Sequence, residues 1–145
     1  MGEKWKVPAR KVFISQLAGG TQLAPGTSNS VGAAGTTVWR VELNPISTKA
    51  WDVNLVWVQG TVVDCDIAGD WLTVDDGQGT AKVEQINSIP KARKTFDKGM
   101  YVMVVGYVLQ CGTRPVLKAV KVQDLTNHVN HKVMWSLEVT DLQKS

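Results

Sequence analysis

Val53-Asn-Leu-Val-Trp-Val-Gln-Gly-Thr-Val-Val-Asp64 is a long run rich in β-branched residues, the type that favours strands. Side chains alternate between the two faces of a strand, so Val56, Val58, Gly60 and Val62 share one face. All four are apolar or small, whereas the other face is mixed. We therefore predict a strand whose first face enters the core and which bends at Gly60.

The sequence after this run predicts further strands with the same alternation. Residues 71–75 and 80–83 are separated by Asp76-Gly-Gln-Gly79, a turn sequence, and form a hairpin. Met100–Leu109, which has Gly106 at its centre, and Val116–Val122 complete the set. Residues 87–99 contain Pro90 and several charges, so we expect a connection with at most a short helix.

Five principal strands, a longer connection between the third and fourth, and bend glycines in the first and fourth are typical of an OB-fold barrel. A sandwich needs more strands. After Asp124 the pattern changes to apolar residues at helical spacing without Gly or Pro, which predicts a C-terminal helix. The predicted fold class is all-β, a single five-stranded OB-fold barrel with a C-terminal α-helix.

The chain of 145 residues, 43% of them hydrophobic, fits one domain. We expect residues 1–18 to form an N-terminal segment packed on the barrel and residues 19–37 a flexible Gly/Ser-rich loop. The barrel is expected over 38–125 and an interaction helix over 126–145. The sequence contains neither an apolar run of signal-peptide length nor a membrane-spanning one, so we expect an intracellular, soluble protein without a membrane partner.

No residue pattern supports catalysis, and no cofactor is expected. Asp75 and Asp76 are adjacent on a predicted strand and turn, so they are interpreted as turn residues and not as an acid-base pair. His128 and His131 have no third ligand nearby, which argues against a metal site. Cys65 and Cys111 are expected to be reduced thiols.

Binding of nucleic acid is the rival hypothesis, because OB barrels stack bases on aromatic residues across their middle strands. Trp57, Trp71 and Tyr107 are candidates for such a platform. The charges oppose it: between Val53 and Leu109 there are seven acidic residues against five basic ones, and the net charge of the whole chain is only +3. We expect little or no direct DNA binding. The run at 91–94 is interpreted as a solvated loop that could touch DNA only within a larger assembly.

The C-terminal helix carries apolar residues on two sides when it is plotted at 100° per residue. A helix that closes a barrel needs one apolar stripe, so the second predicts contact with a partner protein or, alternatively, with the N-terminal segment of the chain itself. Which stripe faces outward is left open. One stripe consists of Val133, Met134 and Leu137, and the other of Trp135, Val139 and Leu142.

Two segments, Val58-Gln-Gly-Thr-Val62 and Trp71-Leu-Thr-Val-Asp-Asp-Gly-Gln-Gly79, resemble strands of the replication protein A middle-subunit type of OB-fold. Four further segments resemble the RecQ-mediated genome instability protein 2 family over roughly residues 53–143. They are Val56-Trp-Val-Gln-Gly60, Lys98-Gly-Met-Tyr-Val-Met-Val-Val-Gly106, Leu117-Lys-Ala-Val-Lys-Val-Gln-Asp-Leu125 and Met134-Trp-Ser-Leu-Glu-Val-Thr-Asp-Leu142.

The resemblance implies a non-catalytic nuclear scaffold subunit. It would pair directly with the C-terminal OB domain of a larger RecQ-mediated genome instability subunit. That pair would stabilise the complex of Bloom helicase and topoisomerase III alpha, which dissolves double Holliday junctions without crossovers. The Fanconi anaemia group M protein is a further expected partner of the complex. Lys121, which lies in one matching segment, is expected to pair with an acidic or carbonyl group of the partner or to be an outward-facing lysine of a strand.

Two alternatives remain for the function. One is a free single-strand-binding OB module, which salt-dependent binding to oligonucleotides would identify. The other is a telomere-capping OB subunit of the replication protein A-like class, which would copurify with a telomeric partner.

Overall fold

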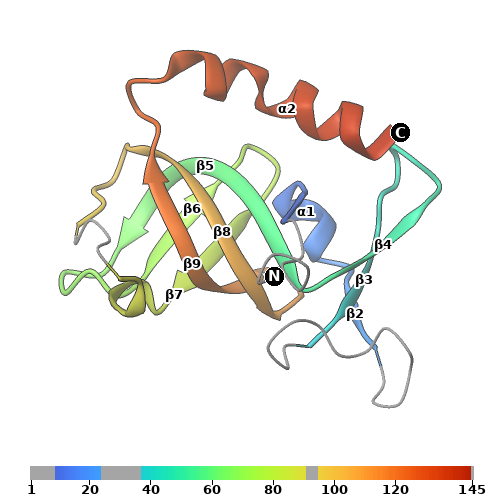
Figure 1. The fold of residues 1–145 in the computed structure, drawn as a ribbon, viewed down its shortest axis with the longest axis horizontal. Helices are drawn as coiled ribbons and strands as arrows, with labels where there is room; N and C mark the ends of the chain where they lie inside the picture. Colours follow the sequence, from blue (N-terminus) through green and yellow to red (C-terminus); the bar gives the residue numbers. More distant parts are fainter. Residues whose placement is uncertain (1–8, 24–36, 91–94, 145) are drawn as a thin grey trace, which may run out of the picture.

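The computed structural model describes residues 9–23, 37–90 and 95–144. Its centre is a barrel of five strands, and a long C-terminal helix lies across one end of it (Figure 1). The barrel strands are β5 (Leu55–Cys65), β6 (Leu72–Asp75), β7 (Thr80–Glu84), β8 (Tyr101–Gln110) and β9 (Val116–Asp124). They correspond to the five principal strands that the sequence predicts.

The barrel closes because β8 pairs with both β9 and β5. The order around it is β5, β6, β7, β9 and β8, and β7 and β9 run parallel while the other pairs are antiparallel. Between β7 and β8 the described residues include the short 3-10 helix η3 (Ile86–Ser88), whereas residues 91–94 of this connection, the basic run, lie outside the described residues. Val56, Val58 and Val62 are at most 1% exposed, which confirms the predicted core face of β5.

Glycines allow the barrel strands to approach each other closely. A Cβ atom on Gly60 would stand 2.5 Å from the carbonyl oxygen of Asp75, and one on Gly106 would stand 2.7 Å from that of Lys118. Real Cβ atoms do not come so close to backbone, so the two strands need glycine where they cross their neighbours. The sequence indicated bends at these glycines; the structure shows close backbone approach at both and a shift of the strand register beside Gly106.

A second, smaller sheet lies beside the barrel (Figure 1). It consists of three antiparallel strands, β2 (Thr21–Gln22), β3 (Trp39–Glu42) and β4 (Ala50–Val53). The structure therefore differs from two predicted boundaries. Residues 39–53 do not belong to the barrel sheet, and residues 21 and 22 pair with β3 although their segment was expected to be a loop. Backbone hydrogen bonds make this pairing independent of side-chain polarity. Residues 24–36 of the expected loop lie outside the described residues.

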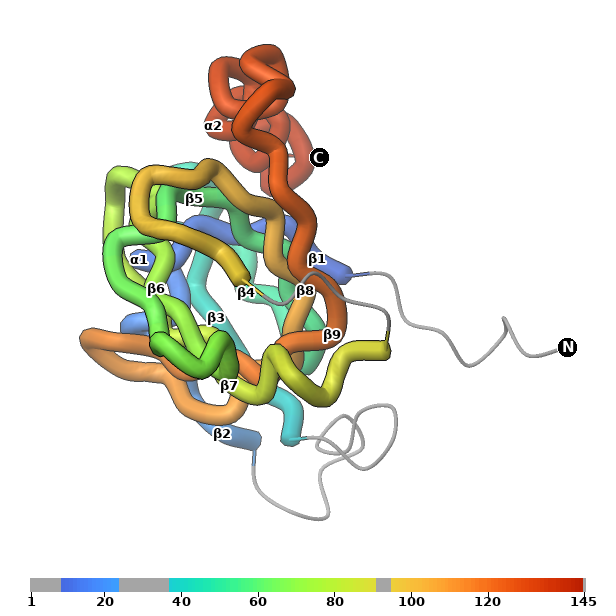
Figure 2. The backbone as a smooth tube through the Cα atoms, turned by 90° about the vertical axis from the view of Figure 1, so that its left-hand side faces the viewer, coloured from blue at the N-terminus to red at the C-terminus, as the bar shows by residue number. Residues whose placement is uncertain are grey.

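The described part of the N-terminal segment contacts the barrel directly. β1 (Arg10–Lys11) pairs in parallel with β5, and α1 (Ile14–Leu17) follows it. Val12, Ile14 and Leu17 are at most 1% exposed and belong to the main core. The C-terminal helix α2 (Val129–Lys144) packs on this segment. In the turned view α2 forms a separate layer above the barrel (Figure 2).

Candidate protein-binding surface

The inner side of α2 carries three buried residues, Trp135, Val139 and Gln143. They follow at intervals of four, so they lie on one face of the helix. Trp135 and Val139 pack with Phe13 of the N-terminal segment, and the partly buried Ile46 and Trp57 border this cluster. Burying two large apolar side chains stabilises the docked helix by about 1.5–3 kcal/mol each.

Two glutamine side chains join the end of α2 to α1. Gln143 Nε2 donates to Gln16 Oε1 at 2.7 Å, and Gln16 Nε2 donates to Gln143 Oε1 at 2.6 Å. Gln16 Oε1 also accepts a hydrogen bond from the backbone N–H of Phe13 at 2.9 Å. Gln143 is fully buried and Gln16 is nearly so, and hydrogen-bonded amides are what such buried sites require.

A third glutamine holds the beginning of α2. Gln59 of β5 is 1% exposed and accepts a hydrogen bond from Trp57 Nε1 at 3.0 Å. Its own Nε2 donates to Tyr101 Oη at 3.2 Å and to the backbone carbonyl of His131 at 3.4 Å. The beginning of α2 is therefore fixed to the barrel by a polar contact, its end is fixed to α1 by another, and its middle packs on the N-terminal segment through apolar side chains.

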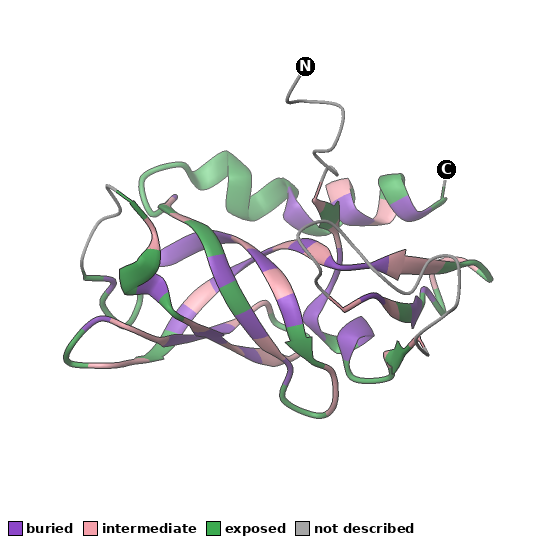
Figure 3. Ribbon diagram, turned by 60° about the horizontal axis from the view of Figure 1, so that its bottom comes forward, coloured by how far each residue is buried: buried purple, intermediate pink, exposed green. Residues whose placement is uncertain are grey.

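The outer side of α2 exposes a second apolar stripe. Val129 and Val133 are each 66% exposed, Leu137 is 56% exposed, and the three follow at intervals of four. Met134, beside them, is 45% exposed. We call these four residues the outer face of α2. Figure 3 shows the beginning of the helix, residues 129–134, exposed, with buried turns only further along it. A contiguous exposed stripe of large apolar side chains is a feature of protein-binding surfaces.

The structure divides the predicted partner-binding residues. Val133, Met134 and Leu137 are free to contact another protein, whereas Trp135 is 4% exposed and Val139 is fully buried. Trp135 and Val139 instead pack on the N-terminal segment of the same chain, which was the alternative to a contact with a partner.

Leu142 and Lys121 were also predicted to bind a partner, whereas Val129 was not. Leu142 does not join the buried stripe, because it is 48% exposed, and Gln143 takes the expected place. Lys121 lies exposed on β9 opposite Val105, so its predicted contact with a partner stays a prediction. Sequence reasoning missed Val129, which the four-residue spacing before Val133 and Leu137 would have revealed.

Asp75 and Asp76 are the turn residues that the sequence indicated. Asp75 accepts the backbone N–H of Gly77 at 2.7 Å, and Asp76 accepts those of Gln78 and Gly79. The second oxygen of Asp76 accepts the N–H of Ile14 at 2.8 Å, which ties the turn to the start of α1. Burial raises the pKa of Asp76, although these three N–H groups oppose the shift.

The outer surface of β6 and β7 brings basic and aromatic side chains together. Lys82 Nζ lies 5.2 Å from the centroid of the Trp71 ring, a cation-π distance. Arg114 donates to Thr73 Oγ1 at 3.0 Å. Sequence reasoning missed Arg114, since charges were counted only as far as Leu109. Lys82 was already counted and forms an ion pair with Glu84 at 3.3 Å, so Arg114 is the cation that this face adds to the count.

His128 and His131 form an edge-to-face pair with ring centroids 5.8 Å apart at the exposed start of α2. Within the described ranges, no three His, Cys, Asp or Glu side chains gather in a way that would hold a metal ion. Neither described helix has the length and apolar character needed to span a membrane.

Comparison with solved structures shows the fold class. The chain aligns with a chain of a replication protein A heterotrimer bound to single-stranded DNA at a TM-score of 0.64, with 16% identity, covering 94% of this chain and 95% of that one. It aligns with a chain of the Stn1-Ten1 complex of S. pombe at a TM-score of 0.66, with 17% identity, covering 95% and 93%. The predicted OB-fold barrel with a C-terminal helix is confirmed.

Sequence comparison shows the family. The family model of RecQ-mediated genome instability protein 2 matches residues 8–143. The protein of that name from Gallus gallus is 36% identical over 138 residues, covering 94% of this chain and 93% of the relative. The protein from Bos taurus is 31% identical over 137 residues, covering 94% and 79%. With the barrel, the packed N-terminal segment and the docked helix, these matches show that the chain belongs to the RecQ-mediated genome instability protein 2 family.

Proposed function

We propose that this chain is a non-catalytic scaffold subunit that binds the C-terminal OB domain of a larger RecQ-mediated genome instability subunit through the outer face of α2. The observation that carries the proposal is the exposed stripe Val129, Val133, Leu137 with Met134 beside it. This stripe is not needed to hold the helix in place, because Trp135, Val139 and Gln143 do that on the opposite side.

The energetics of the outer face suit a stable heterodimer. Each large apolar side chain that leaves water contributes about 1.5–3 kcal/mol, and the outer face has four of them. Part of this gain offsets the entropy lost on association. The helix is already docked before binding, so no further cost of folding it arises. Lys121 on β9 would add a polar contact at the rim of such an interface.

The relatives and structural neighbours of the chain support a role in a larger assembly. Its relatives are named for RecQ-mediated genome instability, and its structural neighbours come from a heterotrimer and from a two-protein complex. We infer that the heterodimer acts in the nucleus, where it stabilises the complex of Bloom helicase and topoisomerase III alpha. Dissolution of double Holliday junctions and suppression of crossovers would follow, with the Fanconi anaemia group M protein as a further partner.

The test is a quantitative binding experiment between this chain and the C-terminal OB domain of the larger subunit, measured by calorimetry. Val133→Ala combined with Leu137→Ala removes apolar area from the outer face, and we expect the affinity to fall at least tenfold. Leu109→Ala is the matched control, because Leu109 is similarly exposed at 44% but lies on β8. Equal affinities for the wild type and the double variant would refute the outer face as the interface.

Binding of single-stranded nucleic acid is a second candidate, favoured by one observation. Trp71 with Lys82, and Thr73 with Arg114, place an aromatic ring and two cations on one barrel face. Fluorescence titration with a thymidine oligonucleotide at two salt concentrations separates the candidates. Salt-sensitive binding that Lys82→Ala and Arg114→Ala both weaken would support this second function.

A further inference from the structure

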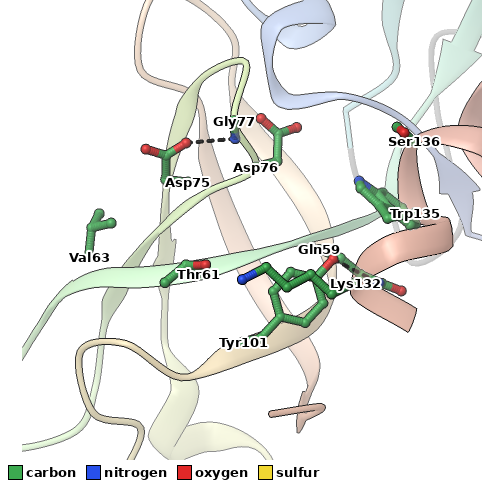
Figure 4. A pocket seen from close by; sticks show the side chains of 10 residues that line it. All are labelled: Gln59, Thr61, Val63, Asp75, Asp76, Gly77, Tyr101, Lys132, Trp135 and Ser136. Carbon is green, nitrogen blue, oxygen red and sulfur yellow. Dashed lines mark hydrogen bonds between the residues drawn. The ribbon is translucent and has the colours of Figure 1, made fainter. Parts of the chain in front are cut away.

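A cavity of about 440 Å³ opens between the first half of α2 and the barrel. Its walls come from β5, from the turn after β6, from the start of β8 and from α2 (Figure 4). Its volume lies in the range of about 300–1,000 Å³ that is usual for ligand pockets. It lies on the inner side of α2, so it is distinct from the outer face that we propose for the heterodimer.

The indole N–H of Trp135 has no acceptor in this cavity. The side chain is 4% exposed, and no hydrogen-bond partner for Nε1 exists among the described residues. Buried N–H groups in proteins nearly always have an acceptor. In Figure 4 the nitrogen end of the Trp135 ring faces the cavity. Nε1 itself is closed off from solvent, so an occupant that brings an oxygen acceptor to this point would satisfy the indole after the Trp135 side chain shifts toward the cavity.

The charged groups of the cavity favour a cation and disfavour an anion. Asp75 and Asp76 line it on one side, and Lys132 lies opposite them, with its Nζ 5.7 Å from the centroid of the Tyr101 ring. Two carboxylates against one ammonium would repel a phosphate or a carboxylate. The acceptor for Trp135 is therefore best supplied by a neutral carbonyl group.

Asp75 is the carboxylate that can receive a donor from an occupant. Both oxygens of Asp76 already accept backbone N–H groups, from Ile14 at one oxygen and from Gln78 and Gly79 at the other. Asp75 accepts the N–H of Gly77 at its Oδ1. A cationic donor that reaches its Oδ2 would form a charge-assisted hydrogen bond, which is stronger than one between neutral groups.

We propose that this cavity binds a segment of another polypeptide that carries an arginine or a lysine. The cationic side chain pairs with Asp75, and a backbone carbonyl of the same segment accepts the indole N–H of Trp135. A polypeptide supplies both groups within one residue, which matches a cavity that offers one free buried donor and an excess of carboxylate. Nucleic acid lacks a cationic group and would place phosphates near the two acids.

The proposal is tested by NMR titration of the 15N-labelled full chain with the peptide acetyl-Gly-Gly-Arg-Gly-Gly-amide. The matched probe replaces the arginine by citrulline, which has the same shape without the charge. Trp135→Phe identifies the Trp135 indole signal among those of the six tryptophans. Asp75→Asn removes the charge but keeps an acceptor for Gly77. Asp66→Asn, outside the cavity, is the control for loss of one negative charge.

The expected result is a saturable shift of the Trp135 indole signal with the arginine peptide. Binding should be about tenfold weaker for the citrulline peptide and for Asp75→Asn, a factor that corresponds to about 1.4 kcal/mol. Asp66→Asn should bind as the wild type does. The proposal is overturned if the indole signal does not saturate, if citrulline binds equally well, or if only a thymidine oligonucleotide moves the signal. Outer-face variants that no longer bind the larger subunit should still show these shifts with the arginine peptide. Failure of one proposal can therefore be told apart from failure of the other.

Discussion

Gln16 and Gln143, which are 127 residues apart in the sequence, exchange two hydrogen bonds of 2.6 and 2.7 Å in a buried site. Through this pair the last turn of α2 is joined to α1, and α1 in turn is held by Asp76 at the barrel turn. The position of the outer face of α2 therefore depends on the N-terminal segment.

Replacing Gln143 by leucine should reduce the free energy of unfolding by about 1–3 kcal/mol, because the Nε2 donor of Gln16 loses its acceptor in a buried site, although its Oε1 still accepts the N–H of Phe13. Denaturation with urea, followed by circular dichroism, measures this loss. Gln123→Leu changes an exposed glutamine of β9 and should stay within about 0.5 kcal/mol of the wild type. Similar stabilities for the two variants would contradict the role of the buried pair.

The two sides of α2 should respond differently to truncation. Trp135→Ala removes the largest side chain of the cluster with Phe13 and should cost about 3–5 kcal/mol of stability. Leu137→Ala, on the outer face, should change stability by less than about 0.5 kcal/mol. Thermal unfolding of the isolated chain distinguishes them. If Leu137→Ala proved as destabilising as Trp135→Ala, the assignment of inner and outer sides would be wrong.

Gly60→Ala should destabilise the barrel by about 1–3 kcal/mol, since the new Cβ would overlap the backbone of Asp75. Gly19→Ala is the control, because nothing lies within 4 Å of a Cβ at that position. Urea midpoints of the two variants measure the difference. A Gly60→Ala protein as stable as the wild type would show that the strand crossing has room for a side chain.

The thiol of Cys111 should react slowly with alkylating reagents. Burial raises its pKa from the usual 9.0 to about 11, so at pH 8 the reactive thiolate is about a hundredfold rarer than for an unperturbed thiol. A Cys65→Ser variant, in which Cys111 is the only cysteine, gives the rate directly. Fast alkylation of the folded variant at pH 8 would argue against the burial of this thiol.

The raised pKa of Cys111 also affects the stability of the protein at high pH. The unfolded thiol ionises near pH 9.0 and the folded one near 11, so the contribution of Cys111 is fully present below pH 9 and is lost as the pH rises toward 11. In the Cys65→Ser background, the unfolding free energy with Cys111 should decline over this interval relative to a Cys111→Ala variant. Parallel curves for the two proteins would contradict the shift.

Local patterns in the sequence determined the five barrel strands, the hairpin turn at Asp75 and Asp76 and the C-terminal helix. Each of these depends on alternation, spacing or turn chemistry within about a dozen residues, which a sequence displays directly. The core face of β5 followed from alternation alone, and the family followed from short segments of characteristic residues.

Only the tertiary structure decided which stripe of α2 faces outward, because Trp135 and Val133 are both apolar and nothing local distinguishes their environments. That choice depends on Phe13, more than a hundred positions away, and on the pairing of Gln16 with Gln143. The separate sheet of β2, β3 and β4 and the contact of Arg114 with Thr73 arise in the same way. The physical reason is that local propensity specifies elements, whereas the faces they bury are set by contacts between distant segments of the chain.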